Sequence, residues 1–399
     1  MMMNTTSRIM KTNNYLLVTY GAIIAIICWS STTSTTTSTT NLVVDAFAFH
    51  GATTTTRTTS LFSASRPTTN TNFPFSTRAA LIEKAKQINT NDNDDTATTT
   101  VTTGTYSARG WSNRLGSVLT PVAIPGVYTA DRPFYWNNID VGCRMTIIEL
   151  SEGGGLWIHS PVNIDKPLIT TIRDKLKQEV KYVVSPNYEH VKYAKEWYEQ
   201  YPTANMWGCP GLCERIPEIK WAGEIPYNYV PGQSIESSSI WDYQNEIIPY
   251  HIDMELNPFT NKPFFNEVIY YHVPSKTLLT TDLYWNYPTN DGRTNSFLLK
   301  RQGDEKQQQN DEQNEELVLD WELAPSVESI PLGSKLWKFG MDQIYKPFYK
   351  NLMIQDKKKY ETMCNTILNE WDIETVIPAH GDILHGKDII RSILTKHLL

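Results

Sequence analysis

The chain has 399 residues and carries 36 Lys and Arg against 43 Asp and Glu, a formal net charge of −7. This balance, without a basic stripe long enough to follow a phosphate backbone, argues against nucleic acid as a partner. Roughly the first quarter is too poor in large apolar residues to build a core, so one folded domain of about 290 residues is expected. The five cysteines are too few for a disulfide-stapled scaffold, so free thiols are expected.

The N-terminal segment has the pattern of a targeting sequence. Arg8 and Lys11 precede the apolar run Tyr15–Trp29, which is shorter than the roughly 20 residues that a spanning helix requires. A positive region before such a run is typical of a secretory signal peptide. From Ala46 to Ile82 the chain has no Asp or Glu, and arginines are spaced through a Ser- and Thr-rich stretch.

Phe47, directly after Ala46 in an Ala-Phe-Ala context, makes this region resemble the bipartite presequence of diatom and related secondary-plastid proteins. The resemblance implies a signal peptide over residues 1–46, a plastid transit peptide over 47–80, and delivery by the secretory route to the chloroplast stroma of a secondary-plastid alga. The alternative is a secreted or anchored protein with a Thr-rich, mucin-like stalk. Residues 81–105 are expected to be a disordered linker before a domain over 106–399.

The first elements of that domain follow from apolar spacing. The runs Cys143–Leu150 and Leu156–Ile158 flank three glycines and predict a β-hairpin. Helical spacing then covers Ile169–Val180, and the apolar run Lys181–Ser185 predicts a strand. A second helix is predicted over Tyr188–Tyr201, because Pro202 would end it.

Later elements complete the α/β pattern. The polar run near 300–316 predicts a surface insertion. Strands interleaved with helices at both ends of the domain favour sheets inside and helices outside. The remaining predicted elements are strands over Glu267–His272, Thr277–Thr281 and Glu374–Ile377, and helices over Leu332–Leu352 and Lys357–Trp371.

Histidine is the informative residue type, because the chain holds only eight. Four segments matter: GGLWIHSP at 154–161, SPNYEH at 185–190, LLTTDL at 278–283 and VIPAHG at 376–381. In this order they resemble the metallo-β-lactamase superfold, and more narrowly an uncharacterised family of plant, algal and cyanobacterial proteins, a domain of unknown function. The resemblance implies an α/β domain folded as an αββα sandwich.

Carried over residue by residue, the metal motif of that superfold is partly dismantled. The two histidines that open its His-x-His-x-Asp-His motif fall on Ser185 and Asn187, so the first of its two ions loses ligands. His251 is a candidate substitute for that ion's third histidine. The positions of the second ion are all occupied, by Glu189, His190, Asp282 and His380. Two nitrogens and two carboxylates suit a single Zn²⁺, Fe²⁺ or Mn²⁺ with room for a water.

The same residues also have structural interpretations. His190 suits a helix N-terminus, Asp282 a strand end and His380 a turn, and the helix dipole alone favours an acid at Glu189. His159, which replaces an Asp of the superfold's pattern, and His385 are candidate ligand contacts or partners of the metal ligands, as are Ser185, Asn187 and His251. For His159 the alternative is a buried structural histidine. Cys209 and Cys213 lack the Cys-x-x-Cys spacing and a second pair, so no cofactor is assigned to them.

Two functions fit this pattern, and no catalytic residue is assigned. The first is a mononuclear metal-dependent hydrolase for an ester, thioester or phosphoester. The second is a non-catalytic protein that binds a small molecule or a plastid protein in the same cleft. No apolar run beyond residue 31 reaches spanning length, so no transmembrane span is expected in the mature protein. Peripheral membrane contact through the aromatic runs 134–136 or 345–349 stays open.

Overall fold

The computed structural model describes residues 118–122, 124–136, 138–151, 154–227, 246–287 and 332–399, all within the compact unit Phe73–Leu399. The predicted signal peptide, transit peptide and linker, the start of the domain at residue 106 and the polar insertion near 300–316 lie outside the described residues. These five features therefore stay predictions.

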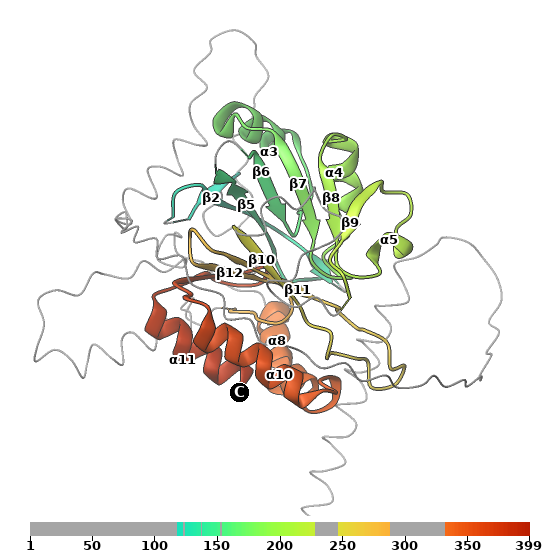
Figure 1. Ribbon diagram of the computed structural model, residues 1–399, viewed down its shortest axis with the longest axis vertical. Coiled ribbons are helices and arrows are strands. Elements are labelled where there is room, and N and C mark those ends of the chain that lie inside the picture. Colours follow the sequence, from blue (N-terminus) through green and yellow to red (C-terminus); the bar gives the residue numbers. More distant parts are fainter. Residues whose placement is uncertain (1–117, 123, 137, 152–153, 228–245, 288–331) are drawn as a thin grey trace, which may run out of the picture. The chain divides into compact units, whose positions relative to one another are not determined.

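The larger of two central sheets has the strand order β1-β2-β5-β6-β7-β8-β9 (Figure 1). Neighbours from β1 to β6 pair antiparallel, whereas β6, β7, β8 and β9 run parallel. A separate two-stranded ribbon pairs β3 (Tyr135–Trp136) with β4 (Ile139–Asp140). The strands of the larger sheet are β1 (Thr120–Pro121), β2 (Val127–Arg132), β5 (Cys143–Glu149), β6 (Leu156–His159), β7 (Val180–Ser185), β8 (Asn205–Gly208) and β9 (Trp221–Glu224).

The smaller sheet has the order β10-β11-β12-β13-β14 and is antiparallel except for the parallel pair β12 and β13. Its strands are β10 (Ile247–His251), β11 (Val268–His272), β12 (Thr277–Thr280), β13 (Thr375–Pro378) and β14 (Leu384–His385).

The helices lie in two groups. The first group is α3 (Lys166–Thr171) with its continuation η2 (Ile172–Leu176), α4 (Ala194–Gln200) and α5 (Leu212–Arg215). The second begins with one continuous helical stretch, α8 (Leu332–Gly340), η3 (Met341–Tyr345), α9 (Lys346–Phe348) and η4 (Tyr349–Met353). It continues with α10 (Lys357–Asn365), η5 (Thr366–Glu370) and α11 (Lys387–Leu398). Among the described residues, no helix is both long and apolar enough to cross a membrane.

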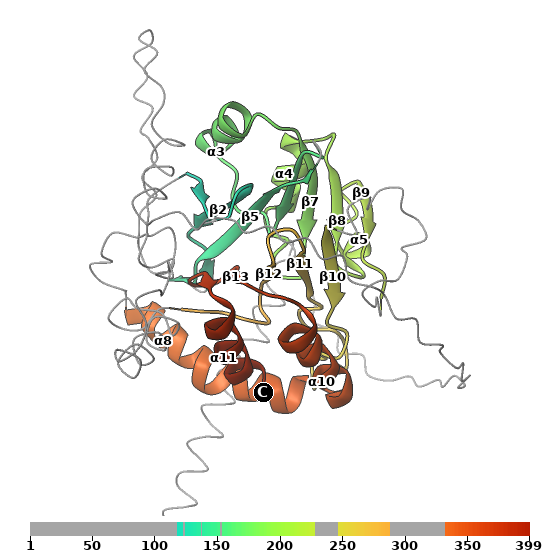
Figure 2. The ribbon, with the colours of Figure 1, turned by 60° about the vertical axis from the view of Figure 1, so that its left-hand side comes forward.

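Two apolar clusters define the layers. Trp157 and Tyr182 of the larger sheet and Tyr270 of the smaller sheet belong to one buried cluster. On the outer face of the larger sheet, Leu168 of α3 and Trp197 of α4 belong to a second cluster with the strands. In Figure 2, α10 and α11 lie on the side of the smaller sheet that faces away from the larger sheet, and the α8 helix lies on that same side. The order helix, sheet, sheet, helix confirms the predicted αββα sandwich.

Two predicted helices have the wrong bounds. The helix predicted over Tyr188–Tyr201 begins only at Ala194, because the Asn187 side chain accepts the backbone N–H groups of Glu189 (3.0 Å) and His190 (2.7 Å) and holds the chain in turns. The helix predicted over Ile169–Val180 runs from 166 to 176 and ends at Lys177, whose φ is +54°. Val180 belongs to β7 instead.

Candidate metal centre

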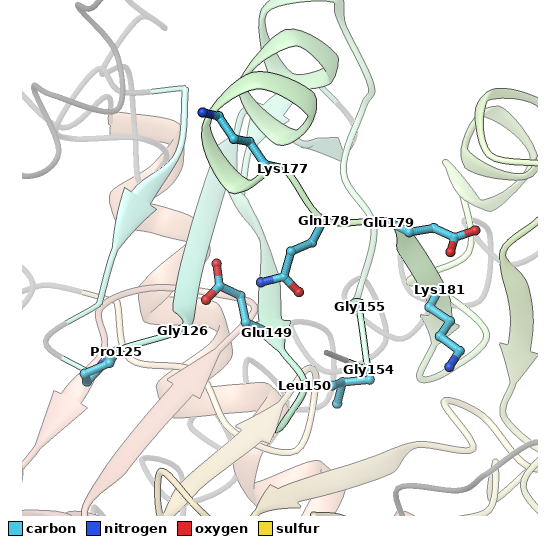
Figure 3. Close-up of a pocket in the computed structure, with 10 residues that line it drawn as sticks. All are labelled: Pro125, Gly126, Glu149, Leu150, Gly154, Gly155, Lys177, Gln178, Glu179 and Lys181. Carbon is cyan, nitrogen blue, oxygen red and sulfur yellow. The ribbon is translucent and has the colours of Figure 1, made fainter. Parts of the chain in front are cut away.

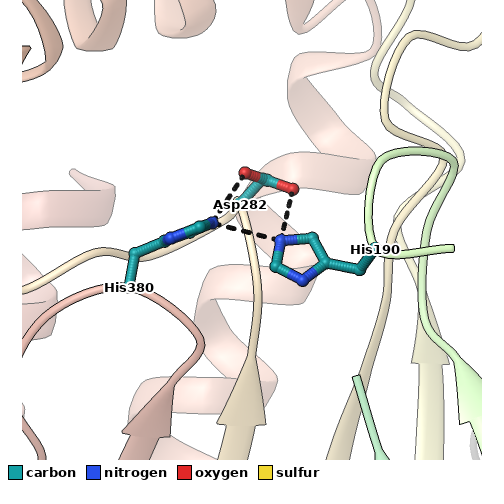
Figure 4. A group of neighbouring side chains, drawn as sticks. All are labelled: His190, Asp282 and His380. Atoms are coloured by element: carbon teal, nitrogen blue, oxygen red, sulfur yellow. Dashed lines mark hydrogen bonds and ion pairs between the residues drawn. The ribbon is translucent and has the colours of Figure 1, made fainter. Parts of the chain in front are cut away.

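Three side chains from three segments meet at one edge of the two sheets (Figure 4). His190 follows β7, Asp282 follows β12 and His380 follows β13. His190 Nε2 lies 3.1 Å from His380 Nε2 and 3.4 Å from Asp282 Oδ2, and His380 Nε2 lies 3.7 Å from Asp282 Oδ1. All three segments leave the carboxyl ends of strands, which is where α/β sheets place ligands.

A metal ion fits these separations. Donor atoms about 2.0–2.1 Å from a tetrahedral ion lie roughly 3.3–3.4 Å apart. The three separations at this edge, 3.1, 3.4 and 3.7 Å, bracket that value. The side chains of Asp282 and His380 keep 13% and 11% of their surface exposed, so solvent reaches the group. Two imidazoles and one carboxylate therefore form a donor set that leaves a position open.

The far nitrogens of both imidazoles have hydrogen-bond partners. His380 Nδ1 lies 2.7 Å from the carbonyl oxygen of Gly142, which can only accept, so Nδ1 carries the proton and Nε2 is free to bind a cation. His190 Nδ1 lies 2.7 Å from Ser160 Oγ and 3.8 Å from Cys143 Sγ. Ser160 is fully buried and takes a φ of +54°, directly after β6. These contacts direct both Nε2 atoms toward Asp282.

The carboxylate of Asp282 is held by its side chain and by its backbone. Asn187 Nδ2 donates to Asp282 Oδ2 over 2.5 Å and to Thr281 Oγ1 over 3.0 Å. The buried carboxylate of Glu267 accepts three consecutive backbone N–H groups, those of Thr281 (2.6 Å), Asp282 (2.9 Å) and Leu283 (2.7 Å). Glu267 therefore fixes the turn that carries Asp282.

The loop that carries His380 is clamped to the larger sheet. Arg144 of β5 donates from Nη1 to the carbonyls of Pro378 (3.1 Å) and Gly381 (2.5 Å), and its Nε pairs with Asp131 (2.7 Å). Gly381 has a φ of +89°, and a Cβ there would lie 2.2 Å from the carbonyl carbon of Asn286. Only glycine fits this close approach.

The electrostatics tie the three groups together. Burial lowers the pKa of His190, but the Asp282 carboxylate outweighs it and holds that pKa well above 6.5. Burial and the neighbouring His190 lower the pKa of His380 to about 4. Burial raises the pKa of Asp282, but the two histidines shift it below its usual value. The site thus favours a carboxylate facing one positive charge, a role that a metal cation can take.

Glu189, the fourth predicted ligand, is not part of the cluster. The residue is exposed at the rim, although its carboxyl is partly shielded from water. This desolvation and the charge of Asp282 raise the pKa of that carboxyl, so Glu189 interacts electrostatically with the centre without ligating it. Ser185 is fully buried at the end of β7, and its Oγ has no hydrogen-bond partner in the described structure.

The other predicted histidines lie in the sheets. His159 is buried against Trp157 and Tyr270, with ring centroids 5.8 and 5.5 Å away, and burial and His190 lower its pKa to about 3. His251 Nε2 lies 2.9 Å from Asn266 Oδ1, and His385 Nδ1 lies 3.3 Å from Thr375 Oγ1. None of these three belongs to the metal-compatible group found among the described residues.

Sequence reasoning missed four residues that organise the centre, namely Ser160, Gly142, Arg144 and Glu267. For Ser160 a signal existed, because this Ser-Pro pair directly follows the buried strand β6. Glu267 also had one, since a single acid stands at the head of the apolar run Val268–His272. Arg144 acts on carbonyls more than 200 residues away, so no local pattern reveals it.

A cavity of about 590 Å³ lies elsewhere (Figure 3). It opens where β5 ends and where β6 and β7 begin, so it sits at the edge of the larger sheet opposite to the histidines. Its charged lining is mixed, with Glu149 and Glu179 beside Lys177 and Lys181. It contains no residue of the candidate centre.

Comparisons with known proteins give one family model that matches part of the chain and a set of similar solved structures. The family model described as a domain of unknown function (DUF4336) matches residues 126–324, a span that contains His190 and Asp282 and ends before His380. The curated proteins contain no match.

Among solved structures, the chain is similar to the metallo-β-lactamase from Pontibacter korlensis, at 12% identity over 69% of this chain and 98% of that one, with a TM-score of 0.36. The enzyme from Erythrobacter litoralis gives 10% identity, 70% and 95% coverage and a TM-score of 0.40. The mono-zinc form of the metallo-β-lactamase FIM-1 from Pseudomonas aeruginosa is 10% identical over 73% of this chain and 99% of that one, with a TM-score of 0.39.

Proposed function

We propose that His190, Asp282 and His380 hold a single Zn²⁺, Fe²⁺ or Mn²⁺ ion and that the chain is a metal-dependent hydrolase. The observation that supports this most is the convergence of three donor atoms at separations of 3.1 to 3.7 Å. Both imidazoles also meet the usual requirement of a metal ligand, since the far nitrogen of each has a hydrogen-bond partner.

One ion is proposed rather than two because of Ser185 and Asn187. An amide N–H group donates hydrogen bonds and cannot ligate a cation, and Asn187 uses it on Asp282 Oδ2. Ser185, at the other position of a lost histidine, offers only a buried hydroxyl.

An ion bound here would polarise an ester, thioester or phosphoester and lower the pKa of a bound water toward neutrality. The chain's own residues supply the geometry: Ser160 and the Gly142 carbonyl orient the imidazoles, while Asn187 and Glu267 hold the carboxylate. Glu189 stands exposed at the rim, where burial of its carboxyl and the charge of Asp282 raise its pKa.

The hydrolase proposal is tested with nitrophenyl esters, thioesters and phosphoesters on the full chain loaded with each metal in turn. We expect at least one class to be hydrolysed, and His190→Ala to reduce the rate to background. His251→Gln is the matched control, because it changes a buried histidine outside the cluster and keeps a hydrogen-bonding group near Asn266. A chain that binds one ion and hydrolyses none of the three classes would contradict the catalytic part alone.

The second candidate is a non-catalytic protein that uses this edge to bind a small molecule or a plastid protein. The residues at the two lost histidine positions favour it, because the buried Ser185 hydroxyl and the Asn187 amide supply no imidazole for a first ion. The proposed compartment is the chloroplast stroma, and it rests on the presequence pattern alone.

Ser160 provides a prediction that separates a metal centre from a histidine pair. Ser160→Ala removes the hydroxyl beside His190 Nδ1. It should lower zinc affinity about 10- to 100-fold, the usual effect of removing the hydrogen-bond partner of a metal-ligating histidine. Competition with a chromophoric chelator measures this affinity. Ser334→Ala is the control, since that buried hydroxyl donates to the Asp140 carbonyl. Equal affinities for the two variants would contradict the role given to Ser160.

A further inference from the structure

The α8 helix presents an apolar stripe to solvent. Leu332, Leu336 and Phe339 keep 73%, 61% and 60% of their surface exposed, and their spacing of four and three residues places them on one helical face. The opposite face is anchored. Ser334 is buried against Asp140, and Trp337 lies 5.0 Å from the Trp136 ring and donates to Tyr287. The stripe therefore points away from the domain.

Positive charge gathers along the same helical stretch. Residues 332–359 contain seven lysines and two aspartates, although the whole chain carries a net charge of −7. Lys338 pairs with Asp342 and Lys359 with Asp253. Five lysines make no ion pair with a described acidic residue, namely Lys335, Lys346, Lys350, Lys357 and Lys358.

The cations crowd one another. Burial and the neighbouring Lys350 lower the pKa of Lys346 to about 8, and Lys396 of α11 adds to this effect. Lys346 Nζ also donates to the Lys396 carbonyl, so the end of α11 lies beside this stretch. Figure 2 shows the helix that begins at α8 running along the margin of the domain, next to α11 and α10.

We propose that α8 and the helical turns up to Met353 dock on an anionic lipid surface. An exposed apolar stripe with lysines beside it is the composition of a helix that lies in the plane of a membrane interface. The apolar side chains enter between the headgroups, and the lysines extend their stems to reach the phosphates. A lipid surface fits better than a protein because flexible lysines and a single apolar stripe require no shaped partner. This inference is independent of the metal centre.

The aromatic runs 134–136 and 345–349, which the sequence left open for membrane contact, are not part of the proposed lipid-binding face. Tyr345 and Tyr349 are buried, at 5% and 6% exposure. Of the run 134–136, only Tyr135 is exposed. The proposed lipid-binding face is the one on which Leu336 and Phe339 of α8 are exposed.

The test is a local fluorescence reporter on the full chain. A Cβ at Gly340 meets no atom within 4 Å, so Gly340→Cys accepts an environment-sensitive label beside Phe339. We expect a blue shift with vesicles of phosphatidylcholine and phosphatidylglycerol, and little with phosphatidylcholine alone. The labelled parent chain gives the background of the native cysteines. Lys195→Cys, on exposed α4, should not respond, which separates docking of α8 from attachment by the apolar segment 15–29.

Variants identify the face. Leu336→Asp with Phe339→Asp should abolish the shift, and Lys335→Glu with Lys350→Glu should weaken binding roughly tenfold or more. Lys195→Glu with Lys220→Glu is the charge control on another surface. No shift with anionic vesicles would overturn the proposal. A label that is already shifted without vesicles, or that shifts with protein concentration, would also overturn it, since another segment of the chain or a second copy would cover the stripe.

Discussion

His190→Ala and His380→Ala each lower the zinc affinity of the chain by more than roughly 100-fold, which is the upper end of the loss expected when only a hydrogen-bond partner of a metal ligand is removed. Each variant leaves only two of three donor atoms, and two donors do not hold a divalent ion against water. Chelator competition measures the affinity, and circular dichroism verifies that the variants fold. Asp282→Asn should have a similar effect, because the amide replaces an anionic oxygen that lies 3.4 Å from His190 Nε2.

His251→Gln and His385→Gln are the controls, since both histidines are buried in the smaller sheet and hydrogen-bonded outside the centre. They should bind zinc as the parent chain does. Zinc affinity that survives in both His190→Ala and His380→Ala would show that any bound ion lies elsewhere.

Glu267→Gln lowers the free energy of unfolding by about 3 kcal/mol or more, the cost of disrupting charge-assisted hydrogen bonds to buried N–H groups. Both carboxylate oxygens accept backbone N–H groups, so the NH₂ of glutamine must face at least one donor. Burial and the nearby Asp282 raise the pKa of Glu267, whereas the backbone N–H groups that it accepts favour its ionised form. Denaturant unfolding gives the change.

Glu255→Gln is the matched control for that substitution. Glu255 is equally buried, but among the described residues it accepts a single backbone N–H group, that of Phe265, and burial raises its pKa to about 8. Replacing a carboxyl that accepts one N–H group should change stability much less than replacing one that accepts three. If the two variants lose equal stability, the turn at Asp282 does not depend on Glu267 as described.

The layers of the fold followed from local patterns. Cys143–Glu149, Val268–His272 and Thr375–Pro378 are rich in apolar residues and are buried along almost their whole length, and such segments predict strands directly. The turn after Ser185 was harder to predict. Tyr188–Tyr201 has helical spacing, but one side chain, Asn187, satisfies two backbone donors and delays the helix until Ala194.

The candidate centre was predictable only where a residue of metal-ligating type stands at a position that the motif order assigns to a ligand. His190, Asp282 and His380 stand in the segments that follow β7, β12 and β13, so the motif order placed them at one edge. Glu189 was expected beside them but lies at the rim, since the turns after Asn187 direct its side chain toward solvent. The partners of the ligands were harder to predict. Ser160 and Glu267 each adjoin a buried strand, which is a local signal, but their contacts with the centre are made to residues distant in sequence. Arg144 has no local signal, because the carbonyls that it holds lie more than 200 residues away.

Elemental mass spectrometry of the purified full chain tests most directly whether one ion binds at His190, Asp282 and His380. The chain is exposed to zinc, iron or manganese in turn and freed of loosely held metal before the measurement. We predict about one equivalent of metal per chain, lost in His190→Ala and kept in His251→Gln. Two equivalents would mean that the first-ion position survives despite Ser185 and Asn187, and no metal in a folded chain would contradict the metal centre itself.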